Sequence, residues 1–98
     1  MLTSAQILKV LQSKQPELRR LGVRRLGLFG STVRGEATPA SDLDFLVEFQ
    51  AKTFDAYMEL KEQLEAWFGR PVDLVIAENV KPQLRERILK ETVYAQGL

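Results

Sequence analysis

Two acidic residues, Asp42 and Asp44, stand two positions apart at the start of a segment that alternates apolar and polar residues. In a strand such a pair points to one face of the sheet, with backbones roughly 7 Å apart. Two carboxylates at that separation repel by about 2 kcal/mol at an effective dielectric near 20, and a divalent cation between them turns the repulsion into attraction. Two exposed aspartates at a strand start are the competing interpretation.

Other metal ligands are missing from the composition, because the chain contains neither histidine nor cysteine. Carboxylate oxygens are hard ligands, and they favour magnesium or manganese over softer metals. The usual general base and thiolate chemistry are also excluded. An enzyme built from this chain must therefore use carboxylates or hydroxyls.

A second candidate site is the pair Gly30-Ser31, which follows an apolar segment. A glycine at a strand-to-helix turn lets a phosphate approach the backbone closely, and the helix start offers free amide donors. The Ser31 hydroxyl can donate another hydrogen bond, and Arg34 can pair with a phosphate. A plain turn capped by Ser31, with Arg34 solvated, is the competing interpretation.

Asp73 is the third candidate, because it interrupts an otherwise apolar segment, Val72 to Ile76. Asp73 is expected to be buried there, and because a buried carboxylate without a partner is costly, it would require a metal, a cation or a catalytic role. The alternative is that Asp73 faces solvent at the strand edge or pairs with Arg70.

The elements that must position these residues follow the order α-β-α-β-α-β-α. Helices are expected after a cap at Thr3 or Ser4 with a break at Pro16, at 32–34, after Thr53 and from Pro82, and strands at 23–29, 42–49 and 71–76. The last helix is expected to turn Leu84, Ile88, Leu89 and Val93 inward.

The sheet is expected to be mixed. A long helix joins the second and third strands, which is typical of a parallel crossover and sets Asp73 beside Asp42 and Asp44. Gly30 can lie at the end of the sheet that holds these aspartates only if the first and second strands are antiparallel. The prediction is an α/β (α+β) fold with a three-stranded mixed sheet.

Bulk properties set wider limits. The 98 residues predict one domain, 1–98, and the net charge of +1 gives no general attraction to nucleic acid or membrane. The N-terminus has no signal-peptide pattern and no apolar run could span a bilayer. A cytoplasmic location is therefore expected.

Taken together, the motifs point to a family. Residues 28–35, Leu-Phe-Gly-Ser-Thr-Val-Arg-Gly, and 41–47, Ser-Asp-Leu-Asp-Phe-Leu-Val, resemble the G-S-x(n)-D-x-D signature of DNA polymerase beta-like nucleotidyltransferases. More narrowly, they resemble the minimal nucleotidyltransferases (MNT) found with HEPN-domain partners in prokaryotic toxin–antitoxin pairs. The resemblance continues through 69–75 and 81–88, so it covers nearly the whole chain.

The resemblance implies a role for each candidate residue. Gly30 and Ser31, with Arg34 nearby, would hold the triphosphate of the nucleotide; Asp42 and Asp44 would bind two Mg²⁺ ions, or Mn²⁺. Asp73 would be the third metal ligand and would help to deprotonate the attacking hydroxyl. The implied reaction transfers AMP from ATP to a tyrosine of a HEPN-family ribonuclease toxin, with release of pyrophosphate. The chain would then be an antitoxin in a hetero-oligomer with that toxin.

Two other functions stay open. A non-catalytic antitoxin would neutralise its toxin by binding alone, with the final helix and its Arg85, Arg87 and Lys90 as a candidate surface. A nucleotidyltransferase could also use a small molecule or an RNA end as acceptor. The near-neutral charge and the lack of an acceptor domain argue against this last function.

Overall fold

The N-terminal helices begin and end at recognisable signals. The computed structural model describes residues 2–97. Its first helix, α1 (Ser4–Ser13), starts at a capping box: the Thr3 hydroxyl accepts from the Gln6 amide, and the Gln6 side chain accepts from the Thr3 amide. The next helix, α2 (Gln15–Arg20), has Pro16 in its first turn. The predicted break at Pro16 is confirmed, since proline has no N–H to continue α1.

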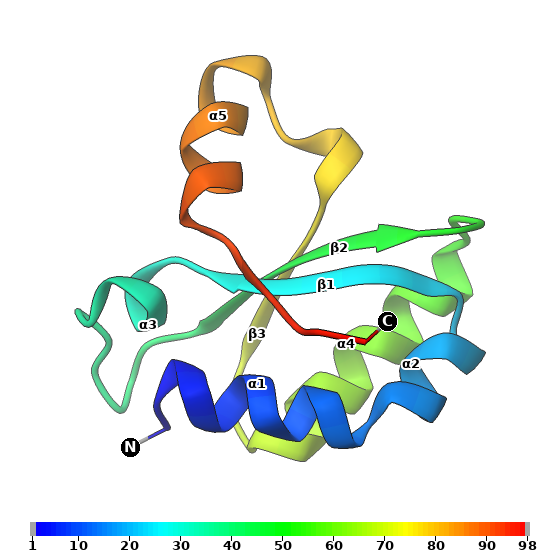
Figure 1. The fold of residues 1–98 in the computed structure, drawn as a ribbon, viewed down its shortest axis with the longest axis horizontal. Helices are drawn as coiled ribbons and strands as arrows, with labels where there is room; N and C mark the ends of the chain where they lie inside the picture. The colour runs from blue at the N-terminus through cyan, green and yellow to red at the C-terminus, as the bar shows by residue number, and fades with distance from the viewer. Residues whose placement is uncertain (1, 98) are drawn as a thin grey trace.

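The long helix α4 (Phe54–Phe68) also follows its sequence signals. The Thr53 hydroxyl accepts from the Ala56 amide at the start, and Gly69 ends the helix in the left-handed conformation at φ 64°. Leu60 and Leu64 are fully buried. Together α1, α2 and α4 cover one face of the sheet (Figure 1).

In the described part of the chain the sheet contains four strands: β1 (Val23–Phe29), β2 (Leu43–Phe49), β3 (Val72–Ile76) and β4 (Val93–Tyr94). Their order is β3-β2-β1-β4. Strands β1 and β2 are antiparallel, whereas β2 and β3 are parallel. The predicted mixed sheet is confirmed, with both strand orientations as expected.

Strand register separates a core face from an open face. Leu28 lies opposite Phe45, and both side chains are fully buried beneath the helices. One position further along, Phe29 lies opposite Asp44, and this pair points to the other face. Asp44 therefore stays out of the core because of its place in the alternation of β2.

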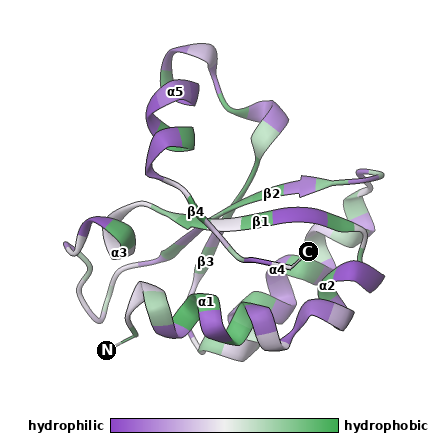
Figure 2. Cartoon of the chain, viewed as in Figure 1, coloured by the Kyte–Doolittle hydropathy of each residue, from purple (hydrophilic) through white to green (hydrophobic). Residues whose placement is uncertain are grey.

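The remaining segments are α3 (Ser31–Arg34), the 3₁₀ turn η1 (Ala77–Asn79) and α5 (Pro82–Glu91). Helix α5 rises from the open face, opposite α1 and α4 (Figure 1). It mixes hydrophilic and hydrophobic residues along its length (Figure 2). On the open face of the sheet, α5 thus stands in place of a full helical layer.

The C-terminal prediction was wrong in two respects. The chain leaves the helix at Thr92 in an extended conformation and adds β4 beside β1, so the sheet has a fourth strand that includes Val93. The expected inner face of α5 is not buried: Leu84, Leu89 and Val93 are 44%, 43% and 41% exposed. A two-residue strand is too short to give an alternating pattern, although the β-branched Thr92 and Val93 favour extended backbone.

None of the helices within residues 2–97 combines the length and apolar character needed to cross a membrane. The longest, α4, has 15 residues, whereas a span requires about 20 apolar ones.

Candidate active site

The turn between β1 and α3 is shaped by Gly30. This residue is buried and has φ 83° and ψ −154°, a backbone conformation that L-residues avoid. A Cβ on Gly30 would lie 2.9 Å from Asp44 Cγ and would overlap the carboxylate. The turn and Asp44 can touch only because residue 30 has no side chain.

The interpretation of Ser31 as helix cap was wrong. Gly30 occupies the cap position, without a side-chain hydrogen bond, and the half-buried Ser31 is the first residue of α3.

Asp42 and Asp44 occupy different settings. Asp44 lies inside β2 and is half-buried, between Phe29 on β1 and Asp73 on β3. Asp42 is exposed and precedes the strand, which starts at Leu43 and not at Asp42 as predicted. The exposed-aspartate interpretation therefore describes Asp42, whereas Asp44 is set into the sheet.

The prediction that Asp73 is buried was wrong. Within β3 the buried residues are Val72 and Leu74, and Asp73 between them is exposed on the open face. Strand β3 is an edge strand, so one side of Asp73 meets solvent. Its expected position is nevertheless correct, because it lies directly opposite Asp44 in the parallel register. The proximity of the carboxylates, and not burial, links Asp73 to the site.

The Asp44 carboxyl group reflects this crowding. Burial, together with the nearby charges of Asp73 and Asp42, raises its pKa from 3.8 to about 6. The guanidinium of Arg34 acts in the opposite sense. The carboxylates at this end of the sheet thus repel one another and would gain from a cation.

Arg70 supports the loop that leads to Asp42. Its guanidinium donates hydrogen bonds to the Thr38 carbonyl, at 2.9 Å, and to the Ser41 carbonyl. It therefore does not serve as the partner of Asp73 that one sequence interpretation allowed. Its role is to fix the residues just before β2.

Glu91, at the end of α5, is a site residue that the sequence did not indicate. One of its carboxylate oxygens accepts from the Gly30 amide at 3.0 Å, and the other accepts from Arg34 Nη1 at 2.7 Å. The Arg34 hydrogen bond, and then the Gly30 amide, hold the pKa of Glu91 below its usual range. Glu91 is 61 residues from Gly30 along the chain, so no local pattern could have paired them.

A cleft of about 270 Å³ lies between the β1–α3 turn and α5, and the lining residues do not include Ser31, Asp42 or Asp73. Its wall includes Gly30, Arg34, Asp44, Leu84, Arg87 and Glu91. Charged and apolar side chains line it together, and such a mixture is typical of a small-ligand site.

The donor set fits magnesium in part. All the candidate ligands are carboxylates, as Mg²⁺ prefers. Within residues 2–97, however, no three acidic side chains are drawn together closely enough to hold a metal ion by themselves. Magnesium is commonly bound by one or two carboxylates together with substrate phosphates. The aspartates can therefore supply some of the ligands of a metal ion, and the phosphates of a bound nucleotide can supply the others.

Comparison with known proteins identifies the family. The nucleotidyltransferase domain family matches residues 4–95. The protein adenylyltransferase MntA of Thermococcus cleftensis is 45% identical, over 96% of this chain and 97% of MntA. A proposed protein adenylyltransferase of Methanocaldococcus jannaschii is 40% identical, over 80% of this chain and 85% of its own length. The chain belongs to the nucleotidyltransferase domain family and is an enzyme of the nucleotidyltransferase class.

Solved structures agree with the fold. A proposed minimal nucleotidyltransferase superposes with a TM-score of 0.74 at 37% identity, covering 88% of this chain and 93% of that one. A crystal structure of a toxin–antitoxin with AMP-PNP gives 0.70 at 24% identity, over 89% and 73%. The complex of a tri-AMPylated HEPN toxin with its MNT antitoxin, from Shewanella oneidensis, gives 0.64 at 21%, over 93% and 73%. At such low identities the last two structures show a shared fold.

Proposed function

We propose that this protein transfers AMP from ATP to a tyrosine hydroxyl of a HEPN-family ribonuclease toxin and so acts as its antitoxin. The observation that carries the proposal is the contact between the Gly30 turn and Asp44, with Asp73 in register beside it. The relationship to MntA supports protein adenylylation. The fold that this chain shares with chains of solved toxin–antitoxin structures supports the choice of partner.

In this proposal the turn holds the nucleotide. The Gly30 amide and the Ser31 hydroxyl donate to phosphate oxygens, and the Arg34 guanidinium pairs with them. The bare backbone at Gly30 keeps the phosphates close to Asp44, because any side chain there would occupy the space. Leu84 and Ile88 on the opposite wall of the cleft give the nucleotide an apolar surface.

The carboxylates then serve the transfer. Asp42 and Asp44 would ligate Mg²⁺, with Mn²⁺ as a substitute, and Asp73 would complete the set. When bound, such ions would supply stabilisation of the negative charge that develops in an in-line displacement. The acceptor oxygen forms a bond to the α-phosphorus while the bond to pyrophosphate breaks, and Asp73 accepts the hydroxyl proton. Asp73 suits this task because its exposed carboxylate is open to an acceptor from outside.

The direct test combines purified protein, ATP labelled in the α-phosphate, Mg²⁺ and the cognate toxin. Label is expected on the toxin, and mass spectrometry should place it on a tyrosine. The double variant Asp42→Ala/Asp44→Ala should transfer nothing, whereas Asp55→Ala, which removes an exposed aspartate from the first turn of α4, should transfer normally. Equal labelling by the double variant and the wild type would contradict the proposal.

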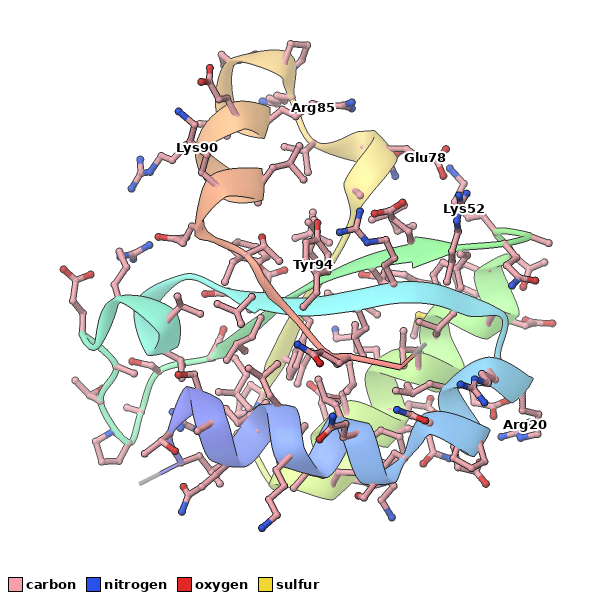
Figure 3. All side chains as sticks on the ribbon, in the orientation of Figure 1. Arg20, Lys52, Glu78, Arg85, Lys90 and Tyr94 are labelled. Carbon is pink, nitrogen blue, oxygen red and sulfur yellow. The ribbon has the colours of Figure 1, made fainter. Side chains whose placement is uncertain are left out.

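A second function is favoured by the exposure of α5. Leu84 and Leu89 are apolar and nearly half exposed, and Arg85 and Lys90 extend from the same helix (Figure 3). Such a surface could neutralise a toxin by binding alone. In that case Asp42→Ala/Asp44→Ala would still rescue cells that express the toxin, so a growth assay with this variant separates the two functions.

A further inference from the structure

The carboxylate of Glu91 lies on the groups that the proposed function assigns to nucleotide phosphates. Its two oxygens accept from the Gly30 amide, at 3.0 Å, and from Arg34 Nη1, at 2.7 Å. A phosphate presents the same features to these donors, namely anionic oxygens that accept from an N–H and from a guanidinium. Glu91 and a bound phosphate would therefore compete for the same hydrogen bonds.

The backbone that carries Glu91 is fixed by contacts of the next two residues. The amide and hydroxyl of Thr92 both donate to the Ile88 carbonyl, at 3.0 and 2.6 Å. The next residue, Val93, pairs with Leu28 of β1. The Glu91 side chain is only 16% exposed. The backbone of Glu91 is thus held in place, and its carboxylate can leave Gly30 and Arg34 only by rotation of the side chain.

The position of Glu91 also matters for charge. It borders the same cleft as Asp44, so a nucleotide that reaches Asp44 must bring its phosphates near the Glu91 carboxylate. Two anions cannot share the Gly30 amide, and their repulsion adds to the steric conflict. Binding therefore requires one anion to leave.

We propose that Glu91 sets the affinity for nucleotide: its carboxylate occupies a phosphate position on Gly30 and Arg34, and it must withdraw before a nucleoside triphosphate binds there. This inference rests on the proposed function, since it takes both residues as phosphate ligands. The exchange replaces one set of charge-assisted hydrogen bonds by another. The apparent dissociation constant then equals the intrinsic constant divided by the fraction of molecules in which Glu91 has withdrawn.

A supporting role for Glu91 would change nucleotide affinity in the opposite direction. If Glu91 instead holds Arg34 ready for the phosphates, its removal would weaken nucleotide binding. The direction of the change in affinity therefore decides between competition and support.

The test measures binding of ATP with Mg²⁺, and of inorganic tripolyphosphate, by calorimetry on Glu91→Gln. Two controls remove the same charge elsewhere. Glu36→Gln removes the other carboxylate that pairs with Arg34, at 2.7 Å from Nε, and leaves the Gly30 amide untouched. Glu86→Gln removes an exposed carboxylate of α5 that pairs with Lys90.

We expect Glu91→Gln to bind both ligands roughly threefold to tenfold more tightly than the wild type. Glu86→Gln should bind as the wild type does, and Glu36→Gln should gain less than Glu91→Gln. The gain with tripolyphosphate would locate the effect at the phosphates. Unchanged or weaker binding by Glu91→Gln, or an equal gain in Glu36→Gln, would overturn the inference.

A measurement on the wild-type protein covers the case in which Glu91→Gln does not fold. The ¹³C resonance of the Glu91 carboxyl should move as tripolyphosphate saturates the protein, because the group loses both donors. A resonance that stays fixed at saturation would overturn the inference. ATP binding to wild type without a gain in Glu91→Gln overturns this inference alone, whereas no ATP binding to the wild type overturns the proposed function as well.

Discussion

Asp44 on β2 and Asp73 on β3 lie directly opposite each other in the parallel part of the sheet. Neither points into the core, since β2 and β3 bury their alternate residues, Phe45 and Leu74 among them. The two carboxylates repel, and this repulsion helps to raise the pKa of Asp44. The fold thus tolerates an unfavourable pair of charges at one end of the sheet, which is typical of a functional site.

Replacing Asp73 should separate activity from stability. Because Asp73 is exposed, Asp73→Asn is expected to change the free energy of unfolding by no more than about 0.5 kcal/mol. If Asp73 accepts the proton of the acceptor hydroxyl, the rate of AMP transfer should fall by roughly 10² to 10⁴. Thermal unfolding and a single-turnover transfer assay measure the two effects. A variant with full transfer activity would remove Asp73 from the mechanism.

Asp44→Asn should stabilise the metal-free protein at neutral pH. The pKa of Asp44 is about 6 in the folded protein, against an ordinary value of 3.8 that applies to the unfolded chain. Between these two pH values the folded state binds more protons than the unfolded state, so the free energy of unfolding falls as pH rises. The variant carries no such penalty, and we expect it to gain about 1 kcal/mol at pH 7.5, after allowance for solvent screening.

Melting temperatures in metal-free buffer check the prediction for Asp44. The variant should melt roughly 4 °C higher than the wild type at pH 7.5, and the difference should shrink toward pH 4, where both side chains are neutral. A variant that melts lower at pH 7.5 would contradict the assignment of repulsion at this site. The same variant should lack transfer activity, so the site would gain stability at the expense of function.

Gly30→Ala should be more damaging than the same change at another left-handed glycine. At Gly30 a Cβ would overlap Asp44, whereas at Gly22, with nearly the same φ of 80°, it would meet nothing within 4 Å. Gly22→Ala should therefore report the backbone strain alone, about 1 kcal/mol. Gly30→Ala should cost about 1–3 kcal/mol more and should abolish ATP binding, since Asp44 must move. Denaturant unfolding of both variants provides the comparison, and equal losses would show that Gly30 is merely a turn residue.

Arg70→Met should lower activity through the loop before β2. The guanidinium bonds the Thr38 and Ser41 carbonyls, and without it these acceptors lose their partner and Asp42 loses its fixed position. We expect a loss of about 1–2 kcal/mol in stability, and a need for more Mg²⁺ to reach half-maximal transfer. Arg20→Met removes an exposed arginine that pairs with Glu17 on α2 and Glu59 on α4, and it should leave the Mg²⁺ requirement unchanged. An identical Mg²⁺ dependence in the two variants would contradict this role.

Local sequence signals predicted much of the fold. The cap at Thr3, the break at Pro16 and the start of α4 after Thr53 are each set by the chemistry of one or two residues. Strand orientation was predictable too, because the connection lengths and the need to bring Gly30 to Asp44 constrain it. These features depend on neighbours in sequence or on a single chain-wide requirement.

The sequence by itself thus determined that Gly30, Asp44 and Asp73 meet at one end of the sheet. Only the tertiary structure decided that Asp73 is exposed, because exposure depends on β3 being an edge strand and not on its apolar neighbours. It also added β4 and brought Glu91 onto Gly30 and Arg34, because α5 crosses the open face before the chain joins β1. Such contacts join residues some sixty positions apart, and neither helical nor strand periodicity carries information over that distance.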